Sequence, residues 1–184
     1  QIWAIQVLCV ITTSGQSDHA VDSYGGWKLK EAAETEQISI VIVDDHPVVR
    51  QGLRAMLSSE PGFTVMGMGA SAREALSLLA HEEPDVVLMD LRMPGMEGTE
   101  AIVELRRLKP DTRILVLTNY GSDEYIVRTM QAGAMGYLLK NTPQEEIVRA
   151  VRIVHRGERY VPKDIAQRLF EAIGRVELSP RELE

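Results

Sequence analysis

The chain has 184 residues, 45% of them hydrophobic and 26% charged, which is enough for one folded core with an appendage. Its net charge of -7 excludes the basic overall surface typical of nucleic-acid-binding domains, so any DNA contact would be local or lie outside this chain. The single cysteine, Cys9, excludes an internal disulfide and a cysteine-based zinc site, and it fits a cytoplasmic location.

Residues 1–37 differ in composition from the rest of the chain. The apolar stretch from Ile2 to Ile11 is too short to span a bilayer, and no basic residues precede it as they would in a secretory signal. The residues that follow are rich in small polar and acidic types and lack helical or strand periodicity. We therefore predict a disordered N-terminal extension and no membrane association.

From Ile38 onward, apolar runs alternate with segments of helical period, as in repeated strand–helix units. Each intervening segment is long enough for the right-handed crossover that parallel strands require. The sequence therefore predicts an α/β fold over residues 38–157, a doubly wound five-stranded parallel sheet with helices on both faces. The predicted strands are residues 38–43, 63–67, 85–90, 113–118 and 135–140.

Helix start signals stand between these strands. Ser71 with Glu74 three residues later forms a capping box, and Thr142 begins the same pattern with Pro143 at the first helical position. The helix that starts near Ser122 has a weaker apolar face, which indicates a helix that faces a partner.

A turn-rich joint after His155 leads into a predicted linker, residues 158–178. Within it, residues 164–173 form an amphipathic helix with apolar residues at helical spacing. These apolar residues are Ile165, Leu169, Phe170 and Ile173. Residues 179–184 read Ser-Pro-Arg-Glu-Leu-Glu, the signal of a helix start, so we predict that they open a further, truncated domain.

Carboxylates follow two of the predicted strands, Asp44 and Asp45 after the first and Asp90 after the third. Ligands bind beyond the carboxyl ends of strands in an open parallel sheet, so these acids are expected to share one site. They would repel one another and raise each other's pKa, and a hard divalent cation would relieve this repulsion. We predict Mg²⁺ held by the three carboxylates and the main-chain carbonyl of Arg92. His46 is expected to have a surface or capping role, because such a metal does not favour imidazole.

Two more strand ends add polar groups, Thr118 and Lys140. Lys140 can neutralise a phosphoryl oxygen, and the Thr118 hydroxyl can donate to another. With Asp90 as the nucleophile, these groups are the parts needed to form an acyl phosphate. Each residue alone has an ordinary structural explanation, such as a turn or a solvated strand end, and only the combination predicts this chemistry.

These residues, in this order and spacing, resemble the receiver domain of two-component response regulators over residues 38 to about 155. The motifs are Val43-Asp44-Asp45, Met89-Asp90, Met93-Pro94-Gly95-Met96-Glu97-Gly98, Thr118 and Lys140. The resemblance implies a flavodoxin-like fold with strand order 2-1-3-4-5 and an Asp90 that accepts a phosphoryl group from a sensor histidine kinase. It also implies a switch relayed by Thr118 and Tyr137, and a phosphoacceptor that catalyses only its own phosphorylation and dephosphorylation.

Three further stretches resemble the LuxR-type, or NarL-like, group, whose receiver precedes a helix-turn-helix domain. They are Asp44-Asp45-His46-Pro47, the run from Gly133 to Lys140, and the closing Leu-Ser-Pro-Arg-Glu. This resemblance implies a transcription regulator that forms a homodimer on phosphorylation and contacts DNA only through a C-terminal domain missing here. Asn141 follows Lys140, where many receivers have proline.

Two alternatives stay open. A magnesium-dependent phosphohydrolase with an Asp nucleophile would need a second acid two residues later and a substrate cap, yet Leu91 and Arg92 follow Asp90 and no cap insertion is evident. A receiver that works alone as an interaction module is the other alternative, and the helix start at Ser179 argues against it.

Overall fold

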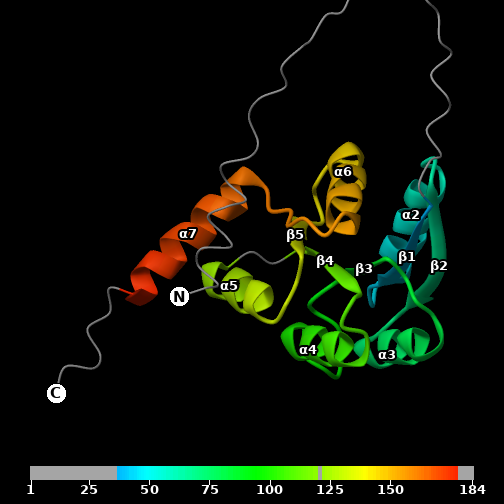
Figure 1. Cartoon of the computed structure of the whole chain (residues 1–184), viewed down its shortest axis with the longest axis horizontal. Coiled ribbons are helices and arrows are strands. Elements are labelled where there is room, and N and C mark those ends of the chain that lie inside the picture. The colour runs from blue at the N-terminus through cyan, green and yellow to red at the C-terminus, as the bar shows by residue number, and fades with distance from the viewer. Residues whose placement is uncertain (1–36, 120–121, 178–184) are drawn as a thin grey trace, which may run out of the picture. The chain divides into compact units, whose positions relative to one another are not determined.

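A computed structural model describes residues 37–119 and 122–177, with side chains up to residue 172. Five parallel strands form one sheet in the order β2-β1-β3-β4-β5 (Figure 1). The strands are β1 (Ile38–Val43), β2 (Phe63–Gly69), β3 (Val86–Met89), β4 (Arg113–Thr118) and β5 (Gly136–Leu139). The predicted fold class and strand order are confirmed, whereas the predictions for residues 1–36 and 178–184 lie outside the described residues.

Helices flank the sheet on both faces. They are α2 (Pro47–Ser58), α3 (Ala72–His81), α4 (Gly98–Leu108), α5 (Asp123–Gln131), α6 (Gln144–His155) and α7 (Lys163–Glu177). In Figure 1, α2 and α6 lie on one side of the sheet and α3, α4 and α5 on the other, while α7 lies beside α5. None of the helices in the described ranges combines the length and apolar character that a membrane crossing requires.

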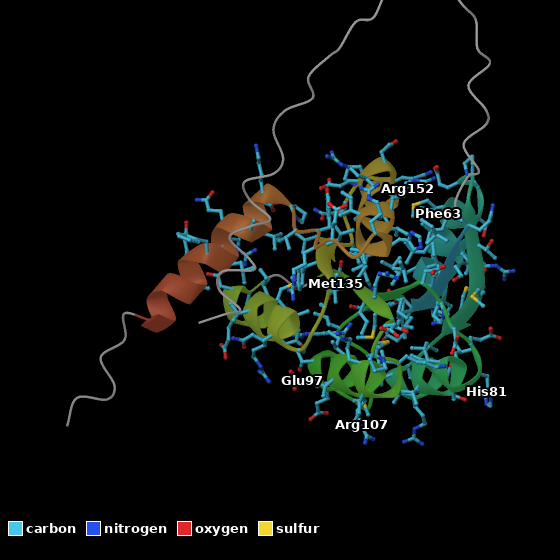
Figure 2. All side chains as sticks on the ribbon, viewed as in Figure 1. Phe63, His81, Glu97, Arg107, Met135 and Arg152 are labelled. Carbon is cyan, nitrogen blue, oxygen red and sulfur yellow. The ribbon has the colours of Figure 1, made fainter. Side chains whose placement is uncertain are left out.

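Side chains alternate between the two faces of each strand, and β1, β3, β4 and β5 are buried on both faces, whereas the edge strand β2 exposes Thr64 and Met66. The larger apolar cluster joins the sheet to α2 and α6 and includes Ile40, Leu88 and Leu138. Arg152 of α6 lies over the ring of Phe63 in β2, with its guanidinium carbon 4.6 Å from the centroid of the ring (Figure 2). By alternation, Tyr137 points to the other face, toward the layer that contains α5.

One predicted helix cap is present and one is not. Ser71 Oγ accepts a hydrogen bond from the Glu74 main-chain N–H at 3.2 Å, which starts α3 as predicted. The capping box predicted at Thr142 is wrong, because the N-cap of α6 is Pro143 and no side chain in the described ranges caps it. The Thr142 N–H instead donates to the Leu139 carbonyl at 2.9 Å, in the turn after β5. The helix therefore starts at Gln144, one residue after the predicted first helical position, Pro143.

The last helix is longer than predicted, and its predicted apolar stripe is only partly confirmed. Helix α7 spans Lys163–Glu177, not residues 164–173. Among the described side chains of α7, Ile165 and Leu169 are buried as predicted and Ala172 is also buried, whereas Phe170 is 58% exposed. The predicted stripe residue Ile173 lies outside the described side chains. A step of one residue turns a helix by about 100°, so Phe170 points away from the face that Leu169 buries.

Candidate functional site

The carboxyl ends of β1 and β3 bring three acids together. Val43 pairs with Met89 in the register of these adjacent strands, and the Asp90 N–H donates to the Val43 carbonyl at 2.8 Å. Asp44 is 2% exposed and Asp90 4% exposed. One ligand atom from each of Asp44, Asp45, Asp90 and His46 lies within 4.8 Å of the others. The acids expected at one edge of the sheet therefore form a single cluster.

Lys140, directly after β5, reaches into this cluster. Its Nζ lies 2.6 Å from Asp44 Oδ2 and 2.6 Å from Asp90 Oδ2. Burial by itself would lower the pKa of Lys140, but the hydrogen bonds and negative charges of the two aspartates outweigh it and raise the pKa. Lys140 therefore stays an ammonium group and offsets part of the negative charge.

Main-chain groups orient the Asp90 carboxylate. Its Oδ1 accepts hydrogen bonds from the N–H groups of Leu91 at 2.7 Å and Arg92 at 3.3 Å. The loop behind these groups lies close to Gly98, where an added Cβ would be 2.5 Å from the Leu91 carbonyl oxygen. Glycine at this position therefore lets the loop pack where it can hold Asp90.

Beside Asp90 lies an open depression formed by the loop from Leu91 to Glu97 together with Tyr125. Glu97 of this loop pairs with Arg128 of α5, with 3.7 Å between Glu97 Oε1 and Arg128 Nη2. The loop that follows Asp90 is therefore in contact with α5.

Thr118 and Tyr137 lie on the same face of neighbouring strands. Thr118 pairs in register with Leu139, two residues beyond Tyr137, and its carbonyl accepts the Lys140 N–H at 2.9 Å. The side chains of Thr118 and Tyr137 are both fully buried. Burial, helped by Tyr125, raises the pKa of the Tyr137 phenol far above its usual range, so the phenol stays neutral.

The sequence analysis did not predict the contact of Arg50 with Asp44, and it predicted the exposure of His46 but not its contacts with the acidic pair. Arg50 Nη1 donates to the Asp44 carbonyl six positions earlier, and the signal for it was a basic residue in the first turn of the helix that follows the acidic pair. His46 is exposed, as expected, but its Nδ1 lies 2.7 Å from Asp45 Oδ1. The His46 N–H also donates to Asp44 Oδ1 at 2.9 Å. His46 occupies the N-cap position of α2 without a side-chain cap bond.

The cluster has the donors that a hard cation prefers. Asp45 Oδ1 is buried and accepts no hydrogen bond of good geometry from the described residues, despite the nearby imidazole. Three carboxylates face one ammonium group, so the cluster has excess negative charge. Oxygen donors with excess negative charge fit Mg²⁺ better than a softer metal.

Comparison with known proteins places the chain in a family. The response regulator receiver domain family matches residues 40–152. Response regulator GacA of Pseudomonas aeruginosa is 43% identical over 132 residues, which cover 72% of this chain and 62% of GacA. The transcriptional regulatory protein YhcZ of Bacillus subtilis is 46% identical over 121 residues, which cover 66% of this chain and 56% of YhcZ. The chain thus spans about three fifths of the length of these curated relatives.

A solved structure agrees with the sequence relatives. The LuxR-family two-component response regulator from Aurantimonas sp. SI85-9A1 superposes with a TM-score of 0.71 at 37% identity, covering 77% of this chain and 99% of that one. The strand order, the acidic cluster and the matched residues agree with one another, and the chain belongs to the response regulator receiver domain family, as the receiver of a LuxR-type two-component regulator.

Proposed function

We propose that Asp90 is the phosphoacceptor of this receiver. The observation that supports it best is the fixed Asp90 carboxylate, held by two main-chain N–H groups with the Lys140 ammonium 2.6 Å away. In the transfer, an Asp90 oxygen bonds to the phosphorus of a kinase phosphohistidine. The P–N bond breaks, its electron pair stays on the imidazole nitrogen, and Asp90 becomes an acyl phosphate.

The neighbouring groups have electrostatic and positioning roles. Lys140 would neutralise charge on a phosphoryl oxygen, and Thr118 would donate its hydroxyl to another. Receiver domains bind Mg²⁺ at an acidic pocket, and here Asp44, Asp45, Asp90 and the Arg92 carbonyl would hold it. The ion supplies charge neutralisation for the phosphoryl group when it is bound.

The output is proposed for the longer protein to which such a receiver belongs. Phosphorylation would draw Thr118 inward, Tyr137 would follow, and the surface formed by α5 and β5 would change its preferred partner. Homodimerisation and DNA binding through a following domain would result. The receiver would also catalyse its own dephosphorylation. GacA is named a response regulator and YhcZ a transcriptional regulatory protein, and these names support an output in the regulation of transcription. The cytoplasmic location stays a prediction.

Acetyl phosphate and Mg²⁺ provide a direct test. We expect intact-mass spectrometry to detect one phosphoryl adduct that is stable in acid and labile in base. Asp90→Asn should abolish it, whereas Asp111→Asn, at an exposed carboxylate outside the cluster, should keep it. Persistent labelling of Asp90→Asn would refute the assignment of Asp90.

A further inference from the structure

Helix α7 packs on α5, the helix that follows the switch strand β4 (Figure 1). Ile165 and Leu169 of α7 are 1% exposed and Ala172 is 9% exposed. Helix α5 itself buries Ile126, Thr129 and Met130. The helix whose weak apolar face predicted a partner therefore has a partner within the same chain.

An ion pair joins the two helices. Arg168 Nε of α7 lies 2.9 Å from Asp123 Oδ1, in the first turn of α5. The two side chains are 37% and 31% exposed, so solvent screens the attraction only in part. The pair ties α7 to the end of α5 that lies nearest in sequence to Thr118.

Strand β5 also contacts the chain that leads into α7. The Tyr160 N–H donates to the Met135 carbonyl at 3.0 Å, and the Tyr137 N–H donates to the Tyr160 carbonyl at 3.1 Å. Tyr160 stands three residues before α7 begins. The positive charge of Arg168 also acts on the Tyr137 phenol, where it opposes the rise in pKa caused by burial. Thus α7 contacts α5 directly, and the residues just before α7 are hydrogen-bonded to β5, the strand that contains Tyr137.

We propose that the α5–α7 contact is the docking surface through which this receiver controls the chain beyond α7, with α7 held on α5 before phosphorylation and loosened from it afterwards. This inference rests on the proposed function of Asp90. If Thr118 and Tyr137 rearrange, α5 must shift relative to β5. Because α7 is attached to both, it cannot keep its full contact with each. A contact made of one short apolar stripe and one partly exposed ion pair is weak enough to open separately from the main core.

Hydrogen–deuterium exchange of the α7 amides in the full chain tests the proposal. After treatment with acetyl phosphate and Mg²⁺, we expect exchange in residues 165–172 to become faster by about fivefold, the scale of a local opening. Asp90→Asn should show no such change. Intact mass of the same samples reports whether the adduct formed.

Variants test the ion pair without phosphorylation. Arg168→Gln should speed α7 exchange by about two- to fivefold, as expected for loss of a partly screened pair. Arg168→Lys should retain most of the protection because it keeps the charge. Arg107→Gln is the control, because it removes an arginine–carboxylate pair with Glu104, 3.2 Å apart, within α4 and not between helices.

The possible failures can be told apart. An adduct on Asp90 with unchanged or slower α7 exchange would overturn the docking proposal and leave the phosphoacceptor assignment intact. The absence of any adduct would overturn the proposed function and this inference with it. If Arg168→Gln left α7 exchange unchanged, the ion pair would not be what holds α7.

Discussion

Lys140 Nζ lies 2.6 Å from Asp90 Oδ2, although the two residues are 50 positions apart in the sequence. The same nitrogen lies 2.6 Å from Asp44 Oδ2. One cation thus bridges two nearly buried carboxylates that would otherwise repel each other. This relationship explains how the acidic cluster can exist in a folded chain before a metal ion or a phosphoryl group arrives.

Lys140→Gln should slow phosphorylation of Asp90 by acetyl phosphate on the order of 100-fold, as when one stabilising donor is removed from a charged transition state. Glutamine keeps most of the side-chain length but lacks the charge that neutralises the phosphoryl oxygen. The rate is measured by intact mass against time. Lys109→Gln, which removes a surface contact of 2.6 Å with Glu83, serves as the control. Equal rates in the two variants would contradict the role of Lys140.

Gly98→Ala should lower the free energy of unfolding by about 1–3 kcal/mol, the usual cost of overpacking. Its Cβ would meet the Leu91 main chain at 2.5 Å, and Leu91 holds Asp90 through its N–H, so phosphorylation should slow as well. Gly52→Ala in α2 is the matched control, since nothing lies within 4 Å of its added Cβ. That change should stabilise the chain by about 0.5–1 kcal/mol. Urea unfolding gives both values, and similar destabilisation of the two variants would contradict the packing argument.

Ser39→Ala should destabilise the chain by about 1.5–3 kcal/mol at neutral pH, the usual contribution of a hydrogen bond to a charged group, because alanine keeps the main-chain N–H but lacks the hydroxyl. Ser39 donates to Asp85 Oδ2 through its hydroxyl at 2.6 Å and its N–H at 2.8 Å. Burial alone would raise the pKa of Asp85, but these bonds, with His155 and Arg113, lower it below its ordinary value of 3.8.

A lowered carboxyl pKa sets the sign of the pH effect. The stabilisation that the Asp85 carboxylate gives through its hydrogen bonds is fully present above pH 3.8, and it is lost as the pH falls through the pKa of Asp85 in the folded chain. The difference in urea midpoint between wild type and Ser39→Ala should therefore shrink below that pH. Ser59→Ala, which removes an exposed bond to the Met56 carbonyl, should show no such pH dependence. A constant difference at all pH values would rule out Asp85 as the partner that matters.

Mg²⁺ should stabilise the chain because the acidic cluster exists only in the folded state. At a concentration ten times the dissociation constant, binding adds about 1.4 kcal/mol to the free energy of unfolding, and EDTA removes it. Asp45→Ala should lose most of this gain, because Asp45 Oδ1 is a buried oxygen without a good hydrogen bond among the described residues. Asp111→Asn should keep the gain. Equal stabilisation of wild type and Asp45→Ala would argue against the acidic pair as the metal site.

Much of the fold was predictable because its signals are local. Apolar runs that end in a polar residue predicted the five strands, and helical periods between them predicted the parallel arrangement. The expected convergence of Asp44, Asp45, Asp90 and Lys140 depended on one further rule, that parallel strands bring their carboxyl ends to the same edge of the sheet.

The sequence-based predictions were wrong or incomplete where contacts between helices, strands and turns decide which residue is buried or hydrogen-bonded. Phe170 was assigned to the apolar stripe but is exposed, since it lies about 100° around the helix from Leu169, outside the face that contains Ile165, Leu169 and Ala172. Thr142 has the right sequence for a cap, yet its N–H is used in the turn that follows β5. The Arg50 contact with Asp44 depends on how α2 leaves the first strand.

The sequence by itself determined the strand–helix alternation, the identity of the acids and the cation, and the edge of the sheet on which they meet, because periodicity and strand ends are properties of neighbouring residues. Only the tertiary structure decided that one ammonium bridges Asp44 and Asp90, and that Arg168 meets Asp123 across 45 positions to seat α7 on α5. Contacts between distant side chains depend on strand register and helix packing, and no local pattern of residues specifies these.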